Sequence, residues 1–511
     1  MIEGWGYGGS RCRSGRIDVG SHWTDKAHSG CDDPYGTSSR AGPNHRRCYK
    51  RRSRSRSRHK KCAGRVGRCC DDASSSVCRP TQEAHRLPSV SDCSDTLGQA
   101  SSDYTSTYSS ASSRAADNGG GPKAVTQGNC AQKLAKAEGN NRDEIPHFSW
   151  RTGITLHNGR YRVLGQLGDG TFGRVLLAED QVKGRETAVK IIRNVDKYTR
   201  NAKREADILR DIGDADPKRA AGCVHMHETF THEAHGASHF CLVFEVLGES
   251  LYDHMKKNRF RGLWVQDIQS VAQQCLSALA FLHEELQLTH TDLKLENVMF
   301  ATTEPSQPSP FPREVLWREL HRSQIGRSCT YVRPANTKIK LIDFGNATYE
   351  LEHHSSTINT RQYRAPEVIL SLGWNERSDL WSVGCILMEL YTGELLFRTH
   401  NSLEHLALME RAVEPFPPAI LVGCEEPIKR DRFILKDSDD NGHIRLRWPE
   451  GAVTTSSERH VKSQRPLVKL VLQQHRSLAE FAASLLILEA SRRPSASAAL
   501  VHPFLFEQFT D

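Results

Sequence analysis

Three polar residues between positions 290 and 297 constrain most tightly what this chain can fold into. Transfer of a phosphoryl group needs a carboxylate to orient the attacking hydroxyl and a cation to neutralise the transferring group, and Asp292 and Lys294 supply them. It also needs an oxygen ligand for Mg²⁺, and Asn297 lies five residues beyond the aspartate. We therefore predict that Asp292, Lys294 and Asn297 are catalytic residues, with Asn297 also a metal ligand.

A second carboxylate follows residues 339–342, which read as a β-strand. Asp343 stands there, followed by Phe and Gly, and its carboxylate is the kind of hard oxygen ligand that Mg²⁺ prefers. Glu367 ends an Ala-Pro-Glu triplet 24 residues further on. We predict that Asp343 is the other metal ligand and that the segment up to Glu367 borders the site.

A glycine-rich turn with the pattern G-x-G-x-x-G-x-V precedes these motifs. Glycines let a backbone turn approach phosphate oxygens without clashes from a Cβ atom. A dinucleotide site also uses G-x-G-x-x-G, but it needs a helix next and an acid about 20 residues on. Here a predicted strand follows, with a lysine on the next strand, which favours a lid over ATP phosphates. The predicted lid comprises Leu167, Gly168, Asp169, Gly170, Thr171, Phe172, Gly173, Arg174 and Val175.

Lys190 lies in the third predicted strand, where a cation can bind the α- and β-phosphates of the nucleotide. Its expected partner is Glu205, 15 residues later, in the first turns of a helix predicted over 199–212. A Lys–Glu pair is more often a solvated surface pair, but the neighbouring motifs favour the binding role. Glu245 and Leu247 are expected to offer backbone groups to adenine.

The first 150 residues differ in composition from the rest of the chain. They hold 24 Lys and Arg against 15 Asp and Glu, whereas residues 151–511 hold 45 against 46. Residues 1–145 are rich in Gly, Ser and Arg and cannot bury enough apolar surface to offset their ordering entropy. We predict a disordered Arg/Ser-rich tail there and a folded domain over about 161–506. Residues 46–68 carry twelve of the basic residues and no acid.

Nine of the 15 cysteines also lie in the first 150 residues. They come without an apolar signal core and without paired C-x₂-C spacing, so we favour free thiols in a reducing compartment over disulfides or zinc. No apolar run reaches the roughly 18 residues that can span a bilayer, so we expect no membrane partner.

The motifs occur in the order found in protein kinases. A further stretch of sequence indicates which family of kinases the chain resembles. Residues 404–411 read Glu-His-Leu-Ala-Leu-Met-Glu-Arg. This is similar to the signature of the CDC-like, or LAMMER, dual-specificity kinases, with one Met-to-Leu change. Residues 290–294, 352–355 and 360–367 also match that family.

The resemblance implies an α+β, two-lobed eukaryotic protein kinase fold. A small antiparallel β lobe is expected over about 161–247 and a mainly helical lobe over about 248–506. Residues 301–337, which contain five prolines, are expected to form an insert between two strands. Asp379 is expected to brace the catalytic loop, and Arg493 to pair with Glu367.

The resemblance also implies an activity: transfer of the ATP γ-phosphate to Ser, Thr and, at least in autophosphorylation, Tyr. The implied cofactors are ATP and Mg²⁺, the implied partners are Ser/Arg-rich splicing factors, and the implied location is the nucleus. Residues 52–57 alternate Arg and Ser and look like the same substrate class.

The chain departs from the family pattern at some positions. Thr291 replaces the Arg that commonly pairs with an activation-loop phosphate, so we expect activity without phosphorylation of that loop. Residues 414–465 depart more widely and leave substrate preference open.

A pseudokinase scaffold is disfavoured, because the predicted catalytic residues are all present. An RNA-binding role of residues 46–68 stays open as a weak accessory contact, and so does the oligomeric state.

Overall fold

The computed structural model describes residues 147–509 apart from 235, 316, 318–329 and 437–442. The predicted tail, residues 1–145 with the basic run 46–68, lies outside the described residues. Within the described part, no helix is long and apolar enough to cross a membrane. The cysteines found there as free thiols are all buried: Cys223, Cys241, Cys275, Cys385 and Cys424.

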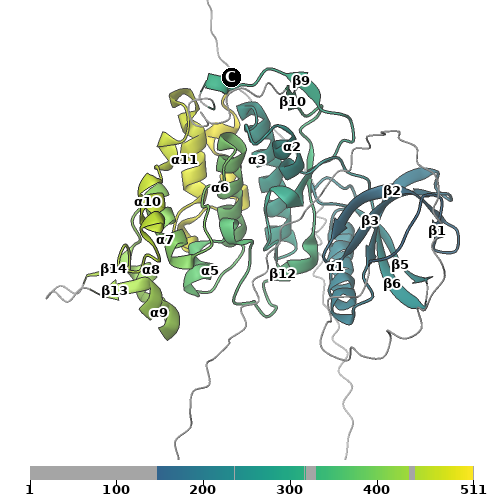
Figure 1. Ribbon diagram of the computed structural model, residues 1–511, viewed down its shortest axis with the longest axis horizontal. Helices are drawn as coiled ribbons and strands as arrows, with labels where there is room; N and C mark the ends of the chain where they lie inside the picture. Colours follow the sequence, from purple (N-terminus) through teal and green to yellow (C-terminus); the bar gives the residue numbers. More distant parts are fainter. Residues whose placement is uncertain (1–146, 235, 316, 318–329, 437–442, 510–511) are drawn as a thin grey trace, which may run out of the picture. The chain divides into compact units, whose positions relative to one another are not determined.

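An antiparallel sheet in the order β1-β2-β3-β4-β6-β5 forms the first part of the described chain (Figure 1). Its strands are β1 Thr155–Leu156, β2 Tyr161–Gly170, β3 Gly173–Asp180, β4 Arg185–Ile192, β5 Met226–Ala234 and β6 Ala237–Phe244. Successive side chains point to opposite faces, so one face gathers a small core that includes Tyr161, Leu176 and Val189. Phe148 and Leu156 belong to this core, so packing of the small lobe begins upstream of Tyr161.

Helix α1, Asp196–Ala215, packs through its apolar stripe into the larger core of the molecule, together with Leu242 of β6. The helix begins three residues before the predicted start, with Asp196 in its first turn, where a carboxylate favours the positive end of the helix dipole. Glu205 therefore lies in the middle of the helix. Its predicted place in the first turns was wrong.

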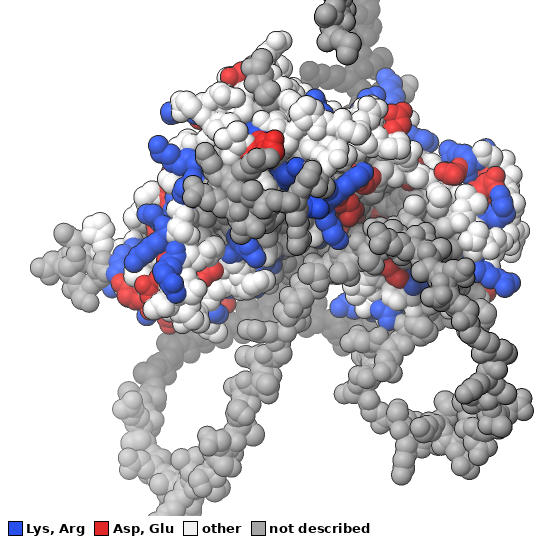
Figure 2. Space-filling model, turned by 45° about the horizontal axis from the view of Figure 1, so that its top comes forward, with Lys and Arg blue, Asp and Glu red and all other residues white. Residues whose placement is uncertain are grey.

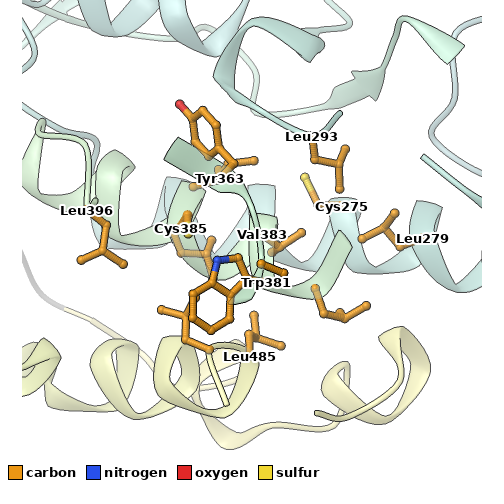
Figure 3. Packing of buried hydrophobic residues seen from close by; sticks show 14 of the residues in the cluster. Cys275, Leu279, Leu293, Tyr363, Trp381, Val383, Cys385, Leu396 and Leu485 are labelled. Atoms are coloured by element: carbon orange, nitrogen blue, oxygen red, sulfur yellow. The ribbon is translucent and has the colours of Figure 1, made fainter. Parts of the chain in front are cut away.

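A helical lobe follows. Its helices are α2 Leu251–Lys257, α3 Val265–Ala280, α5 Pro366–Leu370, α6 Arg377–Thr392, α7 Ser402–Ala412, α8 Pro418–Val422, α9 Pro427–Phe433, α10 Thr455–Ser463, α11 Arg476–Leu485 and α12 Ala496–Ala499. Every residue of α6 from Ser378 to Tyr391 is buried. Figure 3 shows Trp381 and Cys385 of α6 among side chains that include Cys275 of α3 and Leu485 of α11. This core gives the neighbouring loops a rigid support.

Two short antiparallel pairs position the loops that carry the predicted chemistry. Strand β8, Val298–Phe300, pairs with β11, Ile339–Leu341. Asn297 directly precedes β8, and Asp343 lies two residues after β11, so the pairing brings both residues to the same end. Strand β7, Leu288–Thr289, pairs with β12, Thr348–Tyr349, on the other side of this loop.

The predicted insert lies between β8 and β11, as expected. Its described part forms a hairpin of β9, Gln307–Ser309, with β10, Tyr331–Arg333. Asn258, at the end of α2, donates to the Val332 carbonyl at 2.7 Å and accepts from its N–H at 2.9 Å. The hairpin is thereby attached to the helix that follows the sheet.

The charge of the folded part is balanced. On the face drawn in Figure 2, basic and acidic side chains of the described residues lie interspersed. This agrees with the near-equal numbers of basic and acidic residues after position 150. Residues 437–442, within the stretch 414–465 that departs from the family pattern, lie outside the described residues, between β13, Ile434–Lys436, and β14, Ile444–Leu446.

Candidate active site

A buried carboxylate fixes the loop that carries Asp292. Asp379 of α6 is fully buried and accepts hydrogen bonds from the backbone N–H groups of His290 at 2.8 Å and Thr291 at 3.0 Å. His283 Nε2 lies 2.9 Å from the same carboxylate. Thr291 has a φ of 68°, in the left-handed region, and these bonds stabilise that turn. The structure thus shows the bracing contact expected of Asp379.

The Asp292 carboxylate is held on both oxygens. Lys294 Nζ donates to Oδ2 at 2.7 Å. The Thr360 hydroxyl donates to Oδ1 at 2.8 Å, and the Thr360 backbone N–H donates to the same oxygen at 3.1 Å. Lys294 also donates to the Thr360 hydroxyl oxygen at 3.2 Å. A carboxylate fixed in this way can orient a hydroxyl group, and the adjacent ammonium can neutralise developing negative charge.

Asn297 and Asp343 lie at neighbouring strand ends, as predicted. The Asn297 side-chain N–H donates to the Asp292 carbonyl at 2.8 Å, which leaves its amide oxygen as a possible metal ligand. Among the described residues, none donates a hydrogen bond to the Asp343 carboxylate. The Ile342 N–H bonds to the Asn297 carbonyl at 3.0 Å and ties the two segments together. Two hard oxygen donors are therefore available at one place.

The backbone around Asp343 has an unusual conformation. Asp343 has a φ of 64° and a ψ of 70°. The next residue, Phe344, is fully buried, with its ring centroid 5.1 Å from that of His290. His290 Nε2 lies 3.0 Å from the Ile342 carbonyl oxygen. Burial of Phe344 therefore anchors the segment while the neighbouring carboxylate stays partly exposed.

Lys190 and Glu205 form the predicted ion pair. Lys190 Nζ lies 2.8 Å from each oxygen of the Glu205 carboxylate. Burial raises the pKa of Glu205, and the Lys190 charge opposes that shift. Glu205 sits on α1 and Lys190 on β4, so the pair fixes the lysine between helix and sheet. An ammonium in this place can bind phosphate oxygens.

The predicted glycine lid is the turn between β2 and β3. A Cβ atom at Gly173 would lie 2.3 Å from the Ile191 carbonyl oxygen, so a side chain cannot fit there. Gly170 pairs directly with Gly173 at the tip of the hairpin, and Gly168 pairs with Val175. Leu167, which precedes Gly168, is exposed.

Some of the predicted lid residues contact each other and the flanking helix. Arg174 Nη2 lies 2.5 Å from Asp169 Oδ2. The ring of Phe172 packs edge-on against Tyr198 of α1, with 5.1 Å between centroids. The exposed Thr171 accepts a hydrogen bond on its carbonyl from Arg193 at 3.1 Å. These side-chain contacts hold the lid in place, and its glycine backbone is the part suited to phosphates.

The segment predicted to contact adenine follows β6. The Glu245 carboxylate accepts from the His225 backbone N–H at 2.8 Å and pairs with Lys340 Nζ at 3.0 Å. The Glu245 backbone N–H also donates to the His225 carbonyl at 3.2 Å, so its backbone carbonyl is the group that remains for a ligand. Leu247 packs against the main core. At Gly248, a Cβ atom would lie 2.0 Å from the Thr302 carbonyl oxygen, so the chain passes the insert closely.

The sequence-based prediction missed Thr360 as a site residue. Thr360 is the first residue of the stretch 360–367 that matched the family. Its local sequence pattern does not predict a contact with Asp292, which lies 68 residues earlier in the chain. The contact depends on how the segment ending at Glu367 folds back. That fold is anchored by Arg493, whose Nη1 and Nη2 each lie 2.6 Å from a Glu367 carboxylate oxygen.

Comparisons with known proteins agree with this geometry. The family model for the protein kinase domain matches residues 161–505. The dual specificity protein kinase CLK1 of Mus musculus is 38% identical over 369 residues, which cover 71% of this chain and 69% of that protein. The serine/threonine-protein kinase AFC2 of Arabidopsis thaliana is 38% identical over 367 residues, covering 71% and 80%. A crystal structure of a kinase domain superposes with a TM-score of 0.62 at 41% identity, covering 71% of this chain and all of that one.

The fold and the arrangement of these residues define a protein kinase, an enzyme that uses ATP. Within that class, the chain belongs to the CDC-like, or LAMMER, family and is a dual-specificity protein kinase. The family resemblance seen in the sequence is thereby confirmed, as is the two-lobed α+β fold.

Proposed function

We propose that this kinase phosphorylates Ser/Arg-rich proteins, with Asp292 as the residue that orients the acceptor hydroxyl. In the proposed step the hydroxyl oxygen bonds to the γ-phosphorus, the bond to the β-phosphate oxygen breaks, and the hydroxyl proton passes to the Asp292 carboxylate. Lys294 neutralises the transferring group, and Lys190 binds the α- and β-phosphates under the glycine lid. The observation that supports this role of Asp292 is that Lys294 and Thr360 each donate a hydrogen bond to one of its two carboxylate oxygens.

We further propose that Mg²⁺ accompanies ATP, with Asp343 and the Asn297 side-chain oxygen as its protein ligands. The donor set fits this ion, because both groups are oxygen donors and the Asn297 N–H is already committed to Asp292. No group of three or more His, Cys, Asp or Glu in the described part of the chain could hold a metal alone. Phosphate oxygens of the nucleotide would supply further ligands, and the ion would neutralise part of their charge.

A carboxylate in the catalytic loop supports the proposal that the substrates are rich in arginine. Burial raises the pKa of Glu296, and the nearby carboxylates of Asp292 and Asp253 add to the shift. A guanidinium group of a substrate beside Glu296 would stabilise its ionised form.

The composition of the tail supports the same substrate class. Residues 52–57 repeat Arg-Ser three times within a basic run. Such a segment can be an autophosphorylation site, a docking segment for similar proteins or a nuclear import signal, and we propose that the enzyme acts on splicing factors in the nucleus. Weak RNA contact through 46–68 stays a secondary proposal. A steep salt dependence of RNA binding that disappears on deletion of 46–61 supports it.

The test is transfer of labelled γ-phosphate from ATP and Mg²⁺ to an Arg-Ser repeat peptide, by the wild type and Asp292→Asn. Labelled serine with the wild type and a loss of about 10²-fold or more in the variant are expected. Activity on a generic basic protein but not on the repeat contradicts the substrate class. ATP binding without transfer to any acceptor contradicts the proposed role of the site.

A further inference from the structure

Residues 147–154, called the leading segment here, lie directly before β1 and are anchored in the sheet by one aromatic side chain. Phe148 is 5% exposed and belongs to the core on one face of the sheet. Its ring packs edge-on against His232 of β5 and His239 of β6, with 5.7 Å and 5.3 Å between centroids. Phe148 therefore fixes the start of the leading segment against two strands that are distant in sequence.

The rest of the leading segment is attached to β2. Trp150 donates from Nε1 to the Gln166 side-chain oxygen at 3.1 Å. The Gly153 N–H donates to the Val163 carbonyl, and the Val163 N–H donates to the Ile154 carbonyl, each at 2.8 Å. Backbone and side-chain bonds thus keep the segment beside the strand that leads into the glycine lid.

One guanidinium group joins the leading segment to the lid itself. Arg174 of β3 and Asp169 of β2 face each other in register. Arg174 donates to Asp169 Oδ2 from Nε at 3.2 Å and from Nη2 at 2.5 Å, and it donates from Nη1 to the Phe148 carbonyl at 3.0 Å. All three nitrogens of this guanidinium are therefore bonded to the protein, so Arg174 acts on a nucleotide through the lid and not by direct contact.

The lid depends on such contacts because its turn is rich in glycine. A glycine backbone has more accessible conformations than any other, so fixing the turn around phosphates costs much entropy. Arg193 and Tyr198 hold one part of it, through the Thr171 carbonyl and the Phe172 ring. Arg174 supplies a second link, to the leading segment. A lid that is held in place before ATP binds loses less entropy on binding.

We propose that Phe148 and Arg174 are positioning residues for ATP: Phe148 anchors the leading segment, and Arg174 connects this anchor to the glycine lid. The inference rests on the proposed place of the ATP phosphates under the lid. It adds that a segment outside the residues matched by the kinase family model, 161–505, strengthens the binding of the nucleotide.

The kinetic test measures KM for ATP and kcat of the full chain with a basic protein as acceptor. Phe148→Ala and Arg174→Gln are each expected to raise KM for ATP about five-fold, with kcat and KM for the acceptor nearly unchanged. Phe148→Leu keeps an apolar anchor and should keep most of the affinity. Because both residues act through one link, the double variant should have a KM close to that of the weaker-binding single variant. Effects that multiply in the double variant overturn the shared link.

The matched control is a second cross-strand pair on the same two strands. Arg162 of β2 and Glu179 of β3 pair at 2.6 Å, are both exposed, and lie at the other end of the hairpin from the lid. Arg162→Gln is therefore expected to leave KM for ATP as in the wild type. Thermal unfolding of each variant checks the fold, and Arg174→Gln keeps the test decisive where Phe148→Ala lowers stability, because it leaves the core packing of Phe148 intact.

Hydrogen exchange without nucleotide separates this inference from the proposed place of ATP. Amides of residues 167–175 are expected to exchange faster in Phe148→Ala and Arg174→Gln than in the wild type, and at the wild-type rate in Arg162→Gln. Unchanged exchange in both lid variants overturns the inference, even where ATP binds under the lid. Faster exchange with an unchanged KM for ATP supports the link to the lid and contradicts the proposed place of the phosphates.

Discussion

The Thr360 hydroxyl donates a hydrogen bond of 2.8 Å to Oδ1 of Asp292, across 68 residues of sequence. Thr360→Val keeps the branched shape and removes the donor, so we expect kcat/KM on an Arg-Ser peptide to fall about 10²-fold. Thr360→Ser keeps the hydroxyl and is expected to keep most of the activity. Steady-state assays of both variants, with thermal unfolding as the control for folding, measure this. Near-wild-type kinetics of Thr360→Val would show that the hydroxyl does not position Asp292.

Glu389 gives the stability of this kinase a pH dependence. Burial raises its pKa to about 8, above the value of about 4.3 in an unfolded chain, and the Tyr363 hydroxyl donates to the carboxylate at 2.6 Å. Between these values the folded state holds a proton that the unfolded state has lost. The free energy of unfolding therefore falls as pH rises from about 4.5 to 8, by at most about 1.4 kcal/mol per pH unit from this group.

Glu389→Gln removes the titrating group and keeps an acceptor for Tyr363. We expect the variant to lose this part of the pH dependence, so that its stability relative to the wild type increases from pH 5 to pH 8. Urea unfolding at several pH values measures the difference. A constant difference over this range would contradict a raised pKa of Glu389.

The buried pair of Arg493 and Glu367 supports the segment that carries Thr360. Both side chains are nearly inaccessible, and the two bonds between them are 2.6 Å long. Arg493→Met leaves an unpaired buried carboxylate, so we expect a loss of about 3–5 kcal/mol in the free energy of unfolding. Arg476→Met, at the exposed pair of Arg476 with Glu480, is the matched control and should cost less than about 0.5 kcal/mol. Equal losses in denaturant titrations would contradict the importance of burial.

The activation segment, residues 343–367, is attached to α1 by contacts that need no phosphate group. Arg204 of α1 donates to the Ala347 carbonyl at 3.0 Å and pairs with Glu352 at 2.5 Å, and the Tyr349 hydroxyl donates to Asp211 at 2.6 Å. Thr291 stands where an arginine commonly binds an activation-loop phosphate, and its hydroxyl instead donates to the Asn346 carbonyl at 2.8 Å. We expect phosphatase-treated enzyme to keep its activity.

The measurement compares initial rates before and after phosphatase treatment, with mass spectrometry to show that the phosphates are gone. Arg204→Gln should lower the rate several-fold, because it removes the charged link to Glu352. Activity that disappears on dephosphorylation and returns on rephosphorylation would contradict this account.

The sequence by itself determined the chemistry and its order along the chain. Asp292, Lys294, Asn297 and Asp343 lie within short motifs, and the residue types and spacing within each motif already indicate the chemistry that the residues can perform. The glycine turn was predictable for the same reason, since a Cβ atom at Gly173 collides with the neighbouring strand.

Only the tertiary structure decided which distant groups meet. Thr360 reaches Asp292 because the segment up to Glu367 folds back and is anchored by Arg493, and sequence spacing does not encode the path of a long loop. The contact of Arg361 with Ser402 of α7, across 41 residues of sequence, has the same origin. Burial, which shifts the pKa values of Glu389 and Arg364, is likewise a property of the packed molecule.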